Sequence, residues 1–323
     1  MSKEEFQKTI NDFASKYIPF IFLVDFEMEQ FIISDLKNAK KNGLLYDIKG
    51  NSNFEYSNSS KENKIVVAKT IDKRIYQKAF DFVQKNIVHG NSYLLNLTFP
   101  TEINTDSSLK SIFNSSKAPY KLLYKDAFTL FSPECFIKII DNQIFSYPMK
   151  GTIDASIPNA KEVLLNNKKE LNEHFTIVDL IRNDLSIVSK NVTVTKFRYI
   201  DVIKAKDKQL LQASSEIRGT LAQDWRNNLG DIIIKLLPAG SISGAPKRKT
   251  VEIIKQAESL KRGFYTGIFG IFDGKNLDSA VNIRFIEKIK DSFFYRSGGG
   301  ITAQSDMDFE YEELKQKVYV PIS

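Results

Sequence analysis

The sequence is poor in cysteine and histidine and has no long hydrophobic run. Cys135 is the one cysteine among 323 residues, and His89 and His174 are the two histidines. A single cysteine excludes a disulfide within the chain and is typical of a reducing compartment, and these three ligands cannot build a zinc site of the usual kind. The most apolar run, residues 17–26, is too short to span a bilayer, and the opening "MSKEEFQKTI" lacks the apolar core of a secretory signal. We therefore expect a cytoplasmic protein without a membrane span.

Positive charge is in excess, but it is not concentrated. The net charge is +7 and the isoelectric point is near 9.1. The lysines are spread along the chain without a basic block interleaved with aromatic residues, so we expect no nucleic-acid partner. The excess positive charge has two explanations. It is either a solvated basic surface or a basic entrance to an active site that attracts an anionic small molecule.

Hydrophobic periodicity predicts helices mixed with antiparallel strands. Strand-like runs joined by short turns such as "DNQ" and "DGKN" indicate antiparallel pairing, which favours an α+β fold over a doubly wound parallel sheet. The polar residues 41–64 predict a loop. The predicted helices are 72–90, 160–185, 225–236, 246–260 and 308–318, and the predicted strands are 18–25, 92–99, 135–140, 143–149, 192–203, 209–218, 265–272, 278–287 and 292–297.

The stretch "YPMKGT" places Lys150 directly after a strand-like run. Phe145, Tyr147 and Met149 predict a sheet surface that is largely buried. Gly151 leaves the backbone open beside the lysine. Most lysines in such a place lay their stem over apolar surface and keep the amine in water. The alternative is an amine directed into a site, and this stretch alone does not decide between the two.

Two predicted helices each carry glutamates three residues apart. Glu170 and Glu173 in "KKELNEHF" project from one helix face, and Glu310 and Glu313 in "DFEYEELK" repeat the spacing. A solvated acidic face explains either pair alone. If the two faces meet, four like charges require a cation, and Mg²⁺ is a hard ion that takes oxygen ligands. A magnesium site and two solvated faces both remain open at this point.

Two glycine-rich stretches lie in the last third of the chain. "PAGSISGAPKRKT", residues 238–250, runs from a turn toward a predicted helix and offers backbone N–H groups to an anion, but it lacks the Lys-Ser/Thr pair of a phosphate-binding loop. "SGGGITAQSD", residues 297–306, allows close backbone approach to a ligand. Between them Arg284 lies in the otherwise apolar run "AVNIRF", where an acidic side chain or a substrate carboxylate would bind its guanidinium.

Seven short sequence blocks follow one another along the chain. In order, they are "SPECF", "PMKGT", "EHFTIVDLIRNDL", "PAGSISGAPKRKTVEII", "GFYTGIFGIF", "AVNIRF" and "GGGITAQSDMDFEYEELKQK". Together they resemble the signature blocks of the chorismate-utilising enzymes, which include anthranilate synthase component I, aminodeoxychorismate synthase component I, and the isochorismate and salicylate synthases. The resemblance covers residues 75–320 and is loose over residues 1–70. It implies an α+β fold of two packed large antiparallel β-sheets flanked by helices, in a single chorismate-binding catalytic domain over residues 1–323.

The residue at the position of Lys150 differs between branches of that family. The aminodeoxychorismate synthases resemble this chain in carrying a lysine in the P-x-K-G-T block, where anthranilate synthases have a small residue. In that branch the amine is understood to attack C2 of chorismate as the 4-hydroxyl leaves, and ammonia then adds at C4 and expels the lysine. The resemblance therefore implies a transferase that aminates chorismate at C4 to 4-amino-4-deoxychorismate, for 4-aminobenzoate and folate synthesis.

Acidic residues take the catalytic and metal roles that the resemblance implies. Glu134, in "SPECF", matches the general acid/base at the departing hydroxyl. Glu173 and Glu313 match direct Mg²⁺ ligands, with Glu170 and Glu310 holding waters of the ion. Mg²⁺ is the one cofactor expected.

Further positions match residues that contact the substrate. Tyr265 and Arg284 match those that hold the enolpyruvyl carboxylate. The positions that match the lining of the chorismate site are Gly151, Thr152, Ser241, Gly298, Gly299 and Gly300.

Three positions depart from the family pattern. Gln212 stands where many relatives have a histidine before the S-E-I-x-G element, so a histidine-dependent step is not expected. The arginine that usually follows the K-G-T block is replaced by "IDAS". Leu94 stands where isochorismate-forming relatives have a water-activating lysine, which argues against water as the nucleophile.

The expected partners follow from what the chain does not contain. It has neither the cysteine-nucleophile elbow of a glutaminase nor extra length for a fused lyase, so the resemblance implies a separate glutamine amidotransferase subunit that supplies ammonia and a separate aminodeoxychorismate lyase downstream. The rival enzyme is anthranilate synthase component I, which Lys150 opposes. The rival of another class is a non-catalytic binding protein on the same scaffold, which Glu134 and both acidic pairs oppose.

Overall fold

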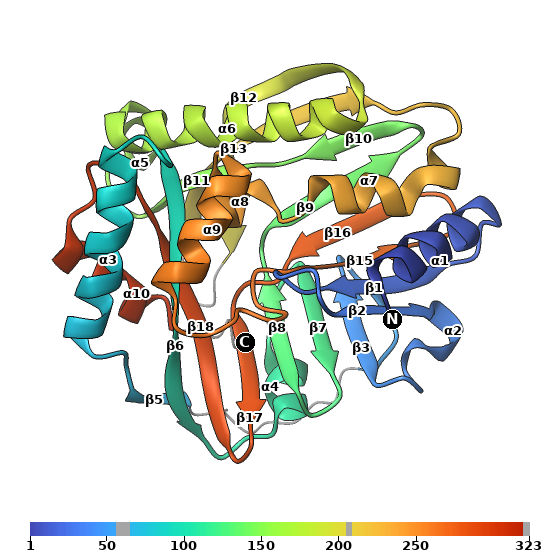
Figure 1. Cartoon of the computed structure of the whole chain (residues 1–323), viewed down its shortest axis with the longest axis horizontal. Coiled ribbons are helices and arrows are strands. Elements are labelled where there is room, and N and C mark those ends of the chain that lie inside the picture. Colours follow the sequence, from blue (N-terminus) through green and yellow to red (C-terminus); the bar gives the residue numbers. More distant parts are fainter. Residues whose placement is uncertain (56–64, 205–208, 319–323) are drawn as a thin grey trace.

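Two large antiparallel sheets form the centre of the molecule. The computed structural model describes residues 1–55, 65–204 and 209–318, and within these ranges each sheet has nine strands. In Figure 1 the strands of one sheet run across the upper half of the molecule and those of the other run up the page. This arrangement confirms the expected α+β fold with two antiparallel sheets flanked by helices.

Strand order in both sheets departs from chain order, so distant segments lie side by side. The first sheet has the order β11 (Met149–Asp154), β13 (Gln209–Thr220), β10 (Gln143–Ser146), β9 (Cys135–Ile140), β16 (Leu277–Val281), β15 (Ile268–Phe272), β1 (Phe20–Val24) and β2 (Phe31–Asp35), with β12 (Lys190–Lys204) paired to β13. The second has the order β14 (Gly244–Ala245), β6 (Leu94–Thr105), β18 (Ser292–Ile301), β17 (Phe285–Ile289), β8 (Phe128–Ser132), β7 (Tyr120–Tyr124), β3 (Leu44–Ile48) and β4 (Asn51–Ser52), with β5 (Ile65–Lys69) paired to β6.

The helices cover the outer faces of the sheets. Their bounds are α1 (Lys3–Ser15), α2 (Leu36–Ala39), α3 (Lys73–Val88), α4 (Leu109–Ser115), α5 (Ala160–Asn166), α6 (Lys168–Val188), α7 (Leu229–Leu236), α8 (Gly240–Ser243), α9 (Lys247–Ala257) and α10 (Met307–Gln316), with a 3₁₀ turn at Trp225–Asn228. Helix α1 was not expected from the sequence. It begins at a capping box in which Ser2 and Glu5 bind each other's backbone N–H groups.

Strand β1 explains the apolar run near the N-terminus. All five of its residues are buried because both faces of the strand are covered. Phe20, Phe22 and Val24 pack into the core beneath the helices, and Ile21 and Leu23 pack between the two sheets. Side chains alternate between faces along a strand, so a continuous apolar run here marks a strand buried on both sides. The loosely similar N-terminal part thus supplies strands β1 and β2 at one end of the first sheet.

Residues 278–287, which we predicted as one strand, form parts of two strands in different sheets. β16 ends at Val281 in the first sheet and β17 begins at Phe285 in the second. Arg284 lies in the connection with φ of 52°, so its prediction as part of an apolar strand was wrong. Both flanking segments are apolar, and the crossing between sheets leaves no break in the hydrophobic pattern. The crossing places Arg284 where the two sheets meet.

Two other predictions of local structure were wrong in detail. The helix expected over residues 160–185 is two helices, because Asn167 has an extended backbone and caps the second helix by accepting from the N–H of Glu170. The loop expected over residues 41–64 contains β3 and β4, and its residues 56–64 lie outside the described part.

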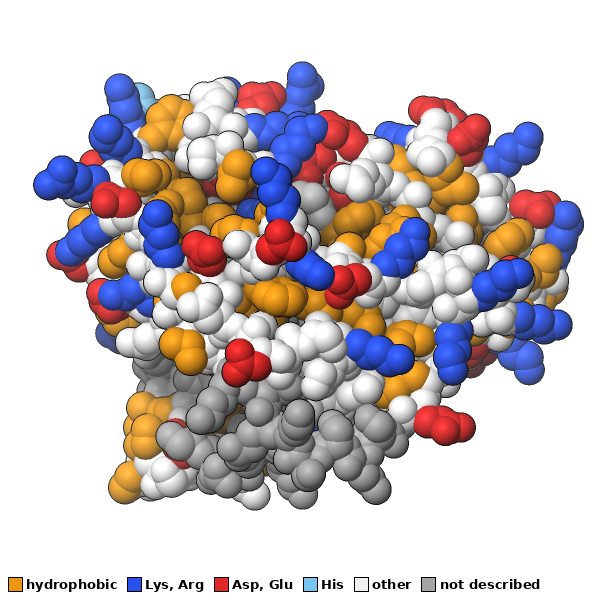
Figure 2. Space-filling model, turned by 90° about the horizontal axis from the view of Figure 1, so that it is seen from below, with side chains coloured by type: hydrophobic (Ala, Val, Ile, Leu, Met, Phe, Trp, Pro, Cys, Tyr) orange, Lys and Arg blue, Asp and Glu red, His pale blue; other side chains and the backbone are white. Residues whose placement is uncertain are grey.

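The excess positive charge is dispersed on the face that Figure 2 displays. Lysine and arginine side chains there stand among acidic and apolar side chains and do not form a continuous basic surface. Among the helices of the described ranges, none is both long and apolar enough to cross a lipid bilayer.

Candidate active site

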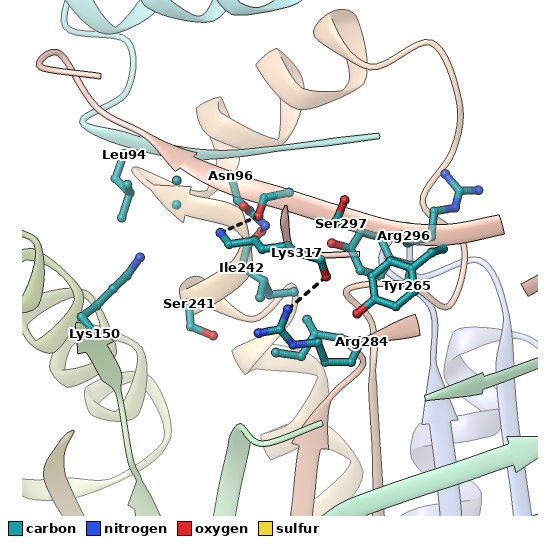
Figure 3. A pocket seen from close by; sticks show the side chains of 15 residues that line it. Leu94, Asn96, Lys150, Ser241, Ile242, Tyr265, Arg284, Arg296, Ser297 and Lys317 are labelled. Atoms are coloured by element: carbon teal, nitrogen blue, oxygen red, sulfur yellow. Dashed lines mark hydrogen bonds between the residues drawn. The ribbon is translucent and has the colours of Figure 1, made fainter. Parts of the chain in front are cut away.

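A cavity of about 180 Å³ lies where the edges of the two sheets approach helix α8. Figure 3 shows Leu94 and Lys150 at one end of it and Tyr265, Arg284 and Arg296 at the other. The lining residues come from β6, β11, α8, β14 and β18, from the segment before β15, from the connection between β16 and β17, and from the segment after α10. They are Leu94, Asn96, Lys150, Ser241, Ile242, Gly244, Tyr265, Ile283, Arg284, Tyr295, Arg296, Ser297, Gly298, Gly300 and Lys317.

A break in strand pairing directs Lys150 toward this cavity. Met149 pairs with Ser214 and Thr152 pairs with Gln212, so the register of β11 shifts at the two residues between them. Gly151 has φ of 83°, a conformation that other residues rarely adopt. Such bulges re-aim side chains and are over-represented next to active sites. The bulge therefore accounts for a lysine whose side chain is only 27% exposed.

The strand surface before Lys150 is less buried than we expected. Phe145, Tyr147 and Met149 are each half-buried, and the fully buried residues are the alternate ones, Ser146 and Pro148. The prediction chose the wrong face of the strand, because the large apolar side chains lie on the partly exposed side. Phe145 and Tyr147 stack on each other there with ring centroids 6.3 Å apart.

The Lys150 amine lies beside the glycine-rich strand β18. A Cβ atom at Gly300 would lie 3.6 Å from Lys150 Nζ and 3.2 Å from Leu94 Cδ1. Any larger side chain at Gly300 would fill the space next to the amine. The Lys150 Nζ atom is 3.7 Å from Glu173 Oε2, so the amine also contacts the acidic face of α6.

Four cationic side chains line the cavity, namely Lys150, Arg284, Arg296 and Lys317. Lys317 Nζ donates to the carbonyl of Gly298 at 2.9 Å and contacts Glu313 Oε1 at 2.6 Å. The carbonyl of Lys317 accepts a hydrogen bond from Arg284 Nη1 at 3.3 Å, which Figure 3 marks with a dashed line. A small cavity with this surplus of cations favours a ligand that carries more than one negative charge.

Glu134 lies next to this cavity and not in its lining. It borders a smaller void together with Ser241, which lines both spaces. Removal from bulk water raises the pKa of Glu134, and a hydrogen bond with Ser241 and the positive charge of Lys150 act in the opposite direction. A carboxyl group with a raised pKa retains its proton more readily, which suits a proton donor.

The two acidic pairs lie on either side of Lys150 and β18. A Cβ atom at Gly151 would lie 3.2 Å from Glu170 Oε2, and one at Gly299 would lie 3.1 Å from Glu310 Oε2. Glu310 is buried and accepts from the Ser305 hydroxyl at 2.8 Å. Both pairs thus face glycines that leave room beside the carboxylates. Within the described part of the chain, however, no three Asp, Glu, His or Cys side chains converge closely enough to hold a metal ion.

The sequence identified about half of the polar lining of the cavity. The expected residues that line it are Lys150, Ser241, Tyr265, Arg284, Gly298 and Gly300. Gly151, Thr152 and Gly299 do not line it, and Thr152 is exposed. Five polar lining residues were not anticipated, namely Asn96, Tyr295, Arg296, Ser297 and Lys317. Helical spacing could have found Lys317, because it lies four residues after Glu313 on the same helix face.

Comparison with known proteins finds a family match, a relative of the same length and a longer, more distant relative. It matches the chorismate binding enzyme family over residues 4–323. It is 53% identical over 323 residues to an uncharacterized PabA-like protein of Pasteurella multocida, with 100% of both chains covered. It is 28% identical over 279 residues to anthranilate synthase component 1 of Acetivibrio thermocellus, with 82% of this chain and 56% of that protein covered.

A solved structure gives the same picture of the fold. MenF, the menaquinone-specific isochorismate synthase from Escherichia coli, superposes with a TM-score of 0.71 at 16% identity, with 97% of this chain and 80% of that chain covered. The family match extends over nearly the whole sequence, including every residue of the cavity. This chain belongs to the family of chorismate-binding enzymes.

Proposed function

We propose that this protein is the chorismate-aminating subunit of an aminodeoxychorismate synthase. The observation that carries the proposal is the amine of Lys150, which a β-bulge presents beside a cation-lined cavity at the glycines of β18. A lysine at this position provides a nucleophile that an enzyme relying on ammonia alone does not need. The product would be 4-amino-4-deoxychorismate, a precursor of 4-aminobenzoate and folate.

The proposed reaction has two displacements with matched bond changes. The lone pair of the Lys150 amine forms a bond to C2 of chorismate, both ring double bonds shift, and the C4–O bond breaks. The Glu134 carboxyl donates its proton to the departing hydroxyl, which leaves as water. Ammonia then bonds to C4, the double bonds shift back, and the C2–N bond to Lys150 breaks. One proton passes from the incoming nitrogen to the lysine nitrogen.

Cationic side chains hold the substrate in this proposal. Chorismate carries two carboxylates, and Arg284 with Tyr265 would bind the enolpyruvyl carboxylate at their end of the cavity. The residues around Lys150 would then face the ring. Ser241, Gly298 and Gly300 would form the walls on which the ring rests, and Gly151, Thr152 and Gly299 would support them from adjacent positions in the chain.

Glutamates are the proposed Mg²⁺ ligands, with Glu173 and Glu313 bound directly and Glu170 and Glu310 holding waters. The donor set fits a hard cation because it consists of carboxylate oxygens, and the neighbouring glycines leave room beside two of these side chains. The direct ligands now contact lysines, so both would exchange an ammonium partner for the metal. When bound, Mg²⁺ would anchor the ring carboxylate and neutralise its charge.

A separate glutamine amidotransferase subunit would supply ammonia to this chain in the cytoplasm, and a separate lyase would act on the product. Under this proposal, glutamine alone does not support amination by the purified chain, whereas ammonium salts at alkaline pH do. Robust glutamine-dependent turnover by the single chain would contradict this division of labour.

The test is incubation of the purified chain with chorismate, Mg²⁺ and an ammonium salt, followed by mass spectrometry of the products. We expect aminodeoxychorismate. Formation of anthranilate instead would identify the rival anthranilate synthase activity. Failure to bind chorismate in the presence of Mg²⁺ would favour a non-catalytic scaffold.

A further inference from the structure

A second cavity, of about 210 Å³, lies on the other side of Leu94 and Lys150 from the substrate cavity. It opens to solvent between the start of β6, the first half of α6 and the turn that follows β18. Its lining consists of Tyr93, Leu94, Asn172, Glu173, Thr176, Thr302, Ala303 and Gln304. No residue of this lining has a role of its own in the chemistry proposed above except Glu173.

The partition between the two cavities is one side chain thick. Leu94, which is 5% exposed, lines both. Beside it the Lys150 amine, in the substrate cavity, lies 3.7 Å from Glu173 Oε2, which lines the second cavity. A molecule in the second cavity is therefore separated from the substrate cavity only by Leu94 and the Lys150–Glu173 pair.

The charges of the two cavities are opposite in sign. The substrate cavity is lined by four cationic side chains. Among the described residues, the lining of the second cavity contains no lysine, arginine or histidine, and its one charged side chain is that of Glu173. A dianion is attracted to the first cavity, while ammonia, which is small and uncharged, meets the amide and hydroxyl groups of Asn172, Thr176 and Gln304 in the second.

We propose that the second cavity is the entrance for ammonia. This inference rests on the proposed amination of chorismate. With chorismate in the cation-lined cavity and bonded to Lys150, ammonia would arrive past Leu94 from the side of Glu173. Its nitrogen then forms the bond to C4, the C2–N bond to Lys150 breaks, and one proton passes to the lysine nitrogen. Separate entrances allow the two reactants to bind without competing for one opening.

Filling the second cavity tests the proposal. Thr176→Phe places a ring in the lining from an exposed position on α6, where the Thr176 hydroxyl donates only to the carbonyl of Asn172 one turn earlier. Ser186→Phe is the matched control, because Ser186 is exposed on the same helix and donates in the same way to the carbonyl of Arg182. Gln304→Trp, in the exposed turn after β18, narrows the opening without touching a helix.

The measurement is the initial rate of chorismate amination against ammonia concentration at fixed pH, with chorismate affinity measured separately by fluorescence titration. We expect Thr176→Phe and Gln304→Trp to raise the KM for ammonia at least about fivefold with chorismate affinity unchanged, and Ser186→Phe to match the wild type. An unchanged ammonia KM in both variants would overturn the entrance alone. Equal losses for ammonia and chorismate would assign the cavity to the substrate site and also overturn it. A wild type that binds chorismate but makes no amine would overturn the proposed function together with the entrance.

Discussion

Lys150 Nζ lies 3.7 Å from Glu173 Oε2, so the proposed nucleophile and a proposed metal ligand are each other's ionic partners. The same holds for Lys317 and Glu313, whose charged atoms are 2.6 Å apart. In the absence of metal the lysines balance the charge of the glutamates. Metal binding would therefore release the Lys150 amine from its carboxylate and couple the metal site to the nucleophile.

This coupling predicts opposite effects of two substitutions on Mg²⁺ affinity. Glu173→Gln removes a charged ligand and should weaken Mg²⁺ binding at least about tenfold. Lys150→Ala removes the competing ammonium and should leave the affinity equal or higher. Titration calorimetry with MgCl₂ checks both. Glu312→Gln is the control, because Glu312 is on the same helix as Glu313 but pairs with Lys315 at the surface. Wild-type affinity in the Glu173 variant would show that the ligand assignment is wrong.

His174 predicts a loss of stability on acidification. The side chain is fully buried, its Nε2 lies 2.6 Å from the Ser215 hydroxyl, and its Nδ1 has no hydrogen-bond partner among the described residues. Burial, with the charges of Arg198 and Lys150, lowers the pKa of His174 from 6.5 to about 4. As the pH falls, His174 therefore binds a proton in the unfolded chain at a higher pH than it does in the folded protein. The stabilising contribution is complete above pH 6.5 and is lost between 6.5 and about 4, by roughly 3 kcal/mol.

Urea unfolding at a series of pH values measures this effect. The wild type should lose unfolding free energy over that interval more steeply than His174→Gln. The other histidine, His89, is exposed at the end of α3, so His89→Gln should retain the wild-type slope. Parallel slopes for the wild type and His174→Gln would contradict the prediction.

The seven sequence blocks identified site residues that can be recognised from their type and from their spacing along the chain. Lys150, Ser241, Gly298 and Gly300 line one cavity, and strand β9 has the predicted bounds. The sequence could not place Arg284, because a crossing between sheets is a tertiary event that leaves the hydrophobic pattern unbroken. Helix α1 was also not predicted. Its capping box, formed by Ser2 and Glu5, is a local sequence signal that could have identified it.

The helix break at Asn167 and the second cavity were not predicted from the sequence, for two different reasons. Asn167 is a polar residue in a polar stretch, and its capping role depends on a backbone angle that the sequence does not state. The second cavity is assembled from three segments that are distant in sequence, which are the start of β6, α6 and the turn after β18. Hydrophobic periodicity reports on one helix or strand at a time, so it does not reveal a cavity that forms between several elements.

A buried ion pair behind the substrate cavity should be critical for stability. Arg262 donates to both carboxylate oxygens of Glu258, at 2.9 and 2.6 Å, and the two side chains are 1% and 5% exposed. Arg262 also donates to the carbonyls of Asn96 and Ile242, which line the cavity. Arg262→Met leaves the Glu258 charge buried without its partner and should lower the unfolding free energy by about 3–5 kcal/mol.

The neighbouring residue supplies the control for that substitution. Lys261 pairs with Glu29 at the surface, where both side chains are more than half exposed. Lys261→Met should leave the urea midpoint nearly unchanged, because water screens exposed pairs. Equal midpoints for the two variants would show that the Arg262 network contributes no more than a surface pair.

The last prediction separates a nucleophilic Lys150 from one that serves only as a charge. Lys150→Arg keeps a cation beside Glu173 but removes the amine nucleophile, and Lys150→Ala removes both. If the amine forms the bond to C2, both variants should lose C4 amination by at least about a hundredfold. In the alanine variant ammonia gains access to C2, so a trace of the 2-amino product should form. The wild type, given chorismate and Mg²⁺ without ammonia, should accumulate a mass adduct on the peptide that contains Lys150, and the arginine variant should not. If Lys150 only balances charge, Lys150→Arg retains most of the activity and the wild type forms no adduct.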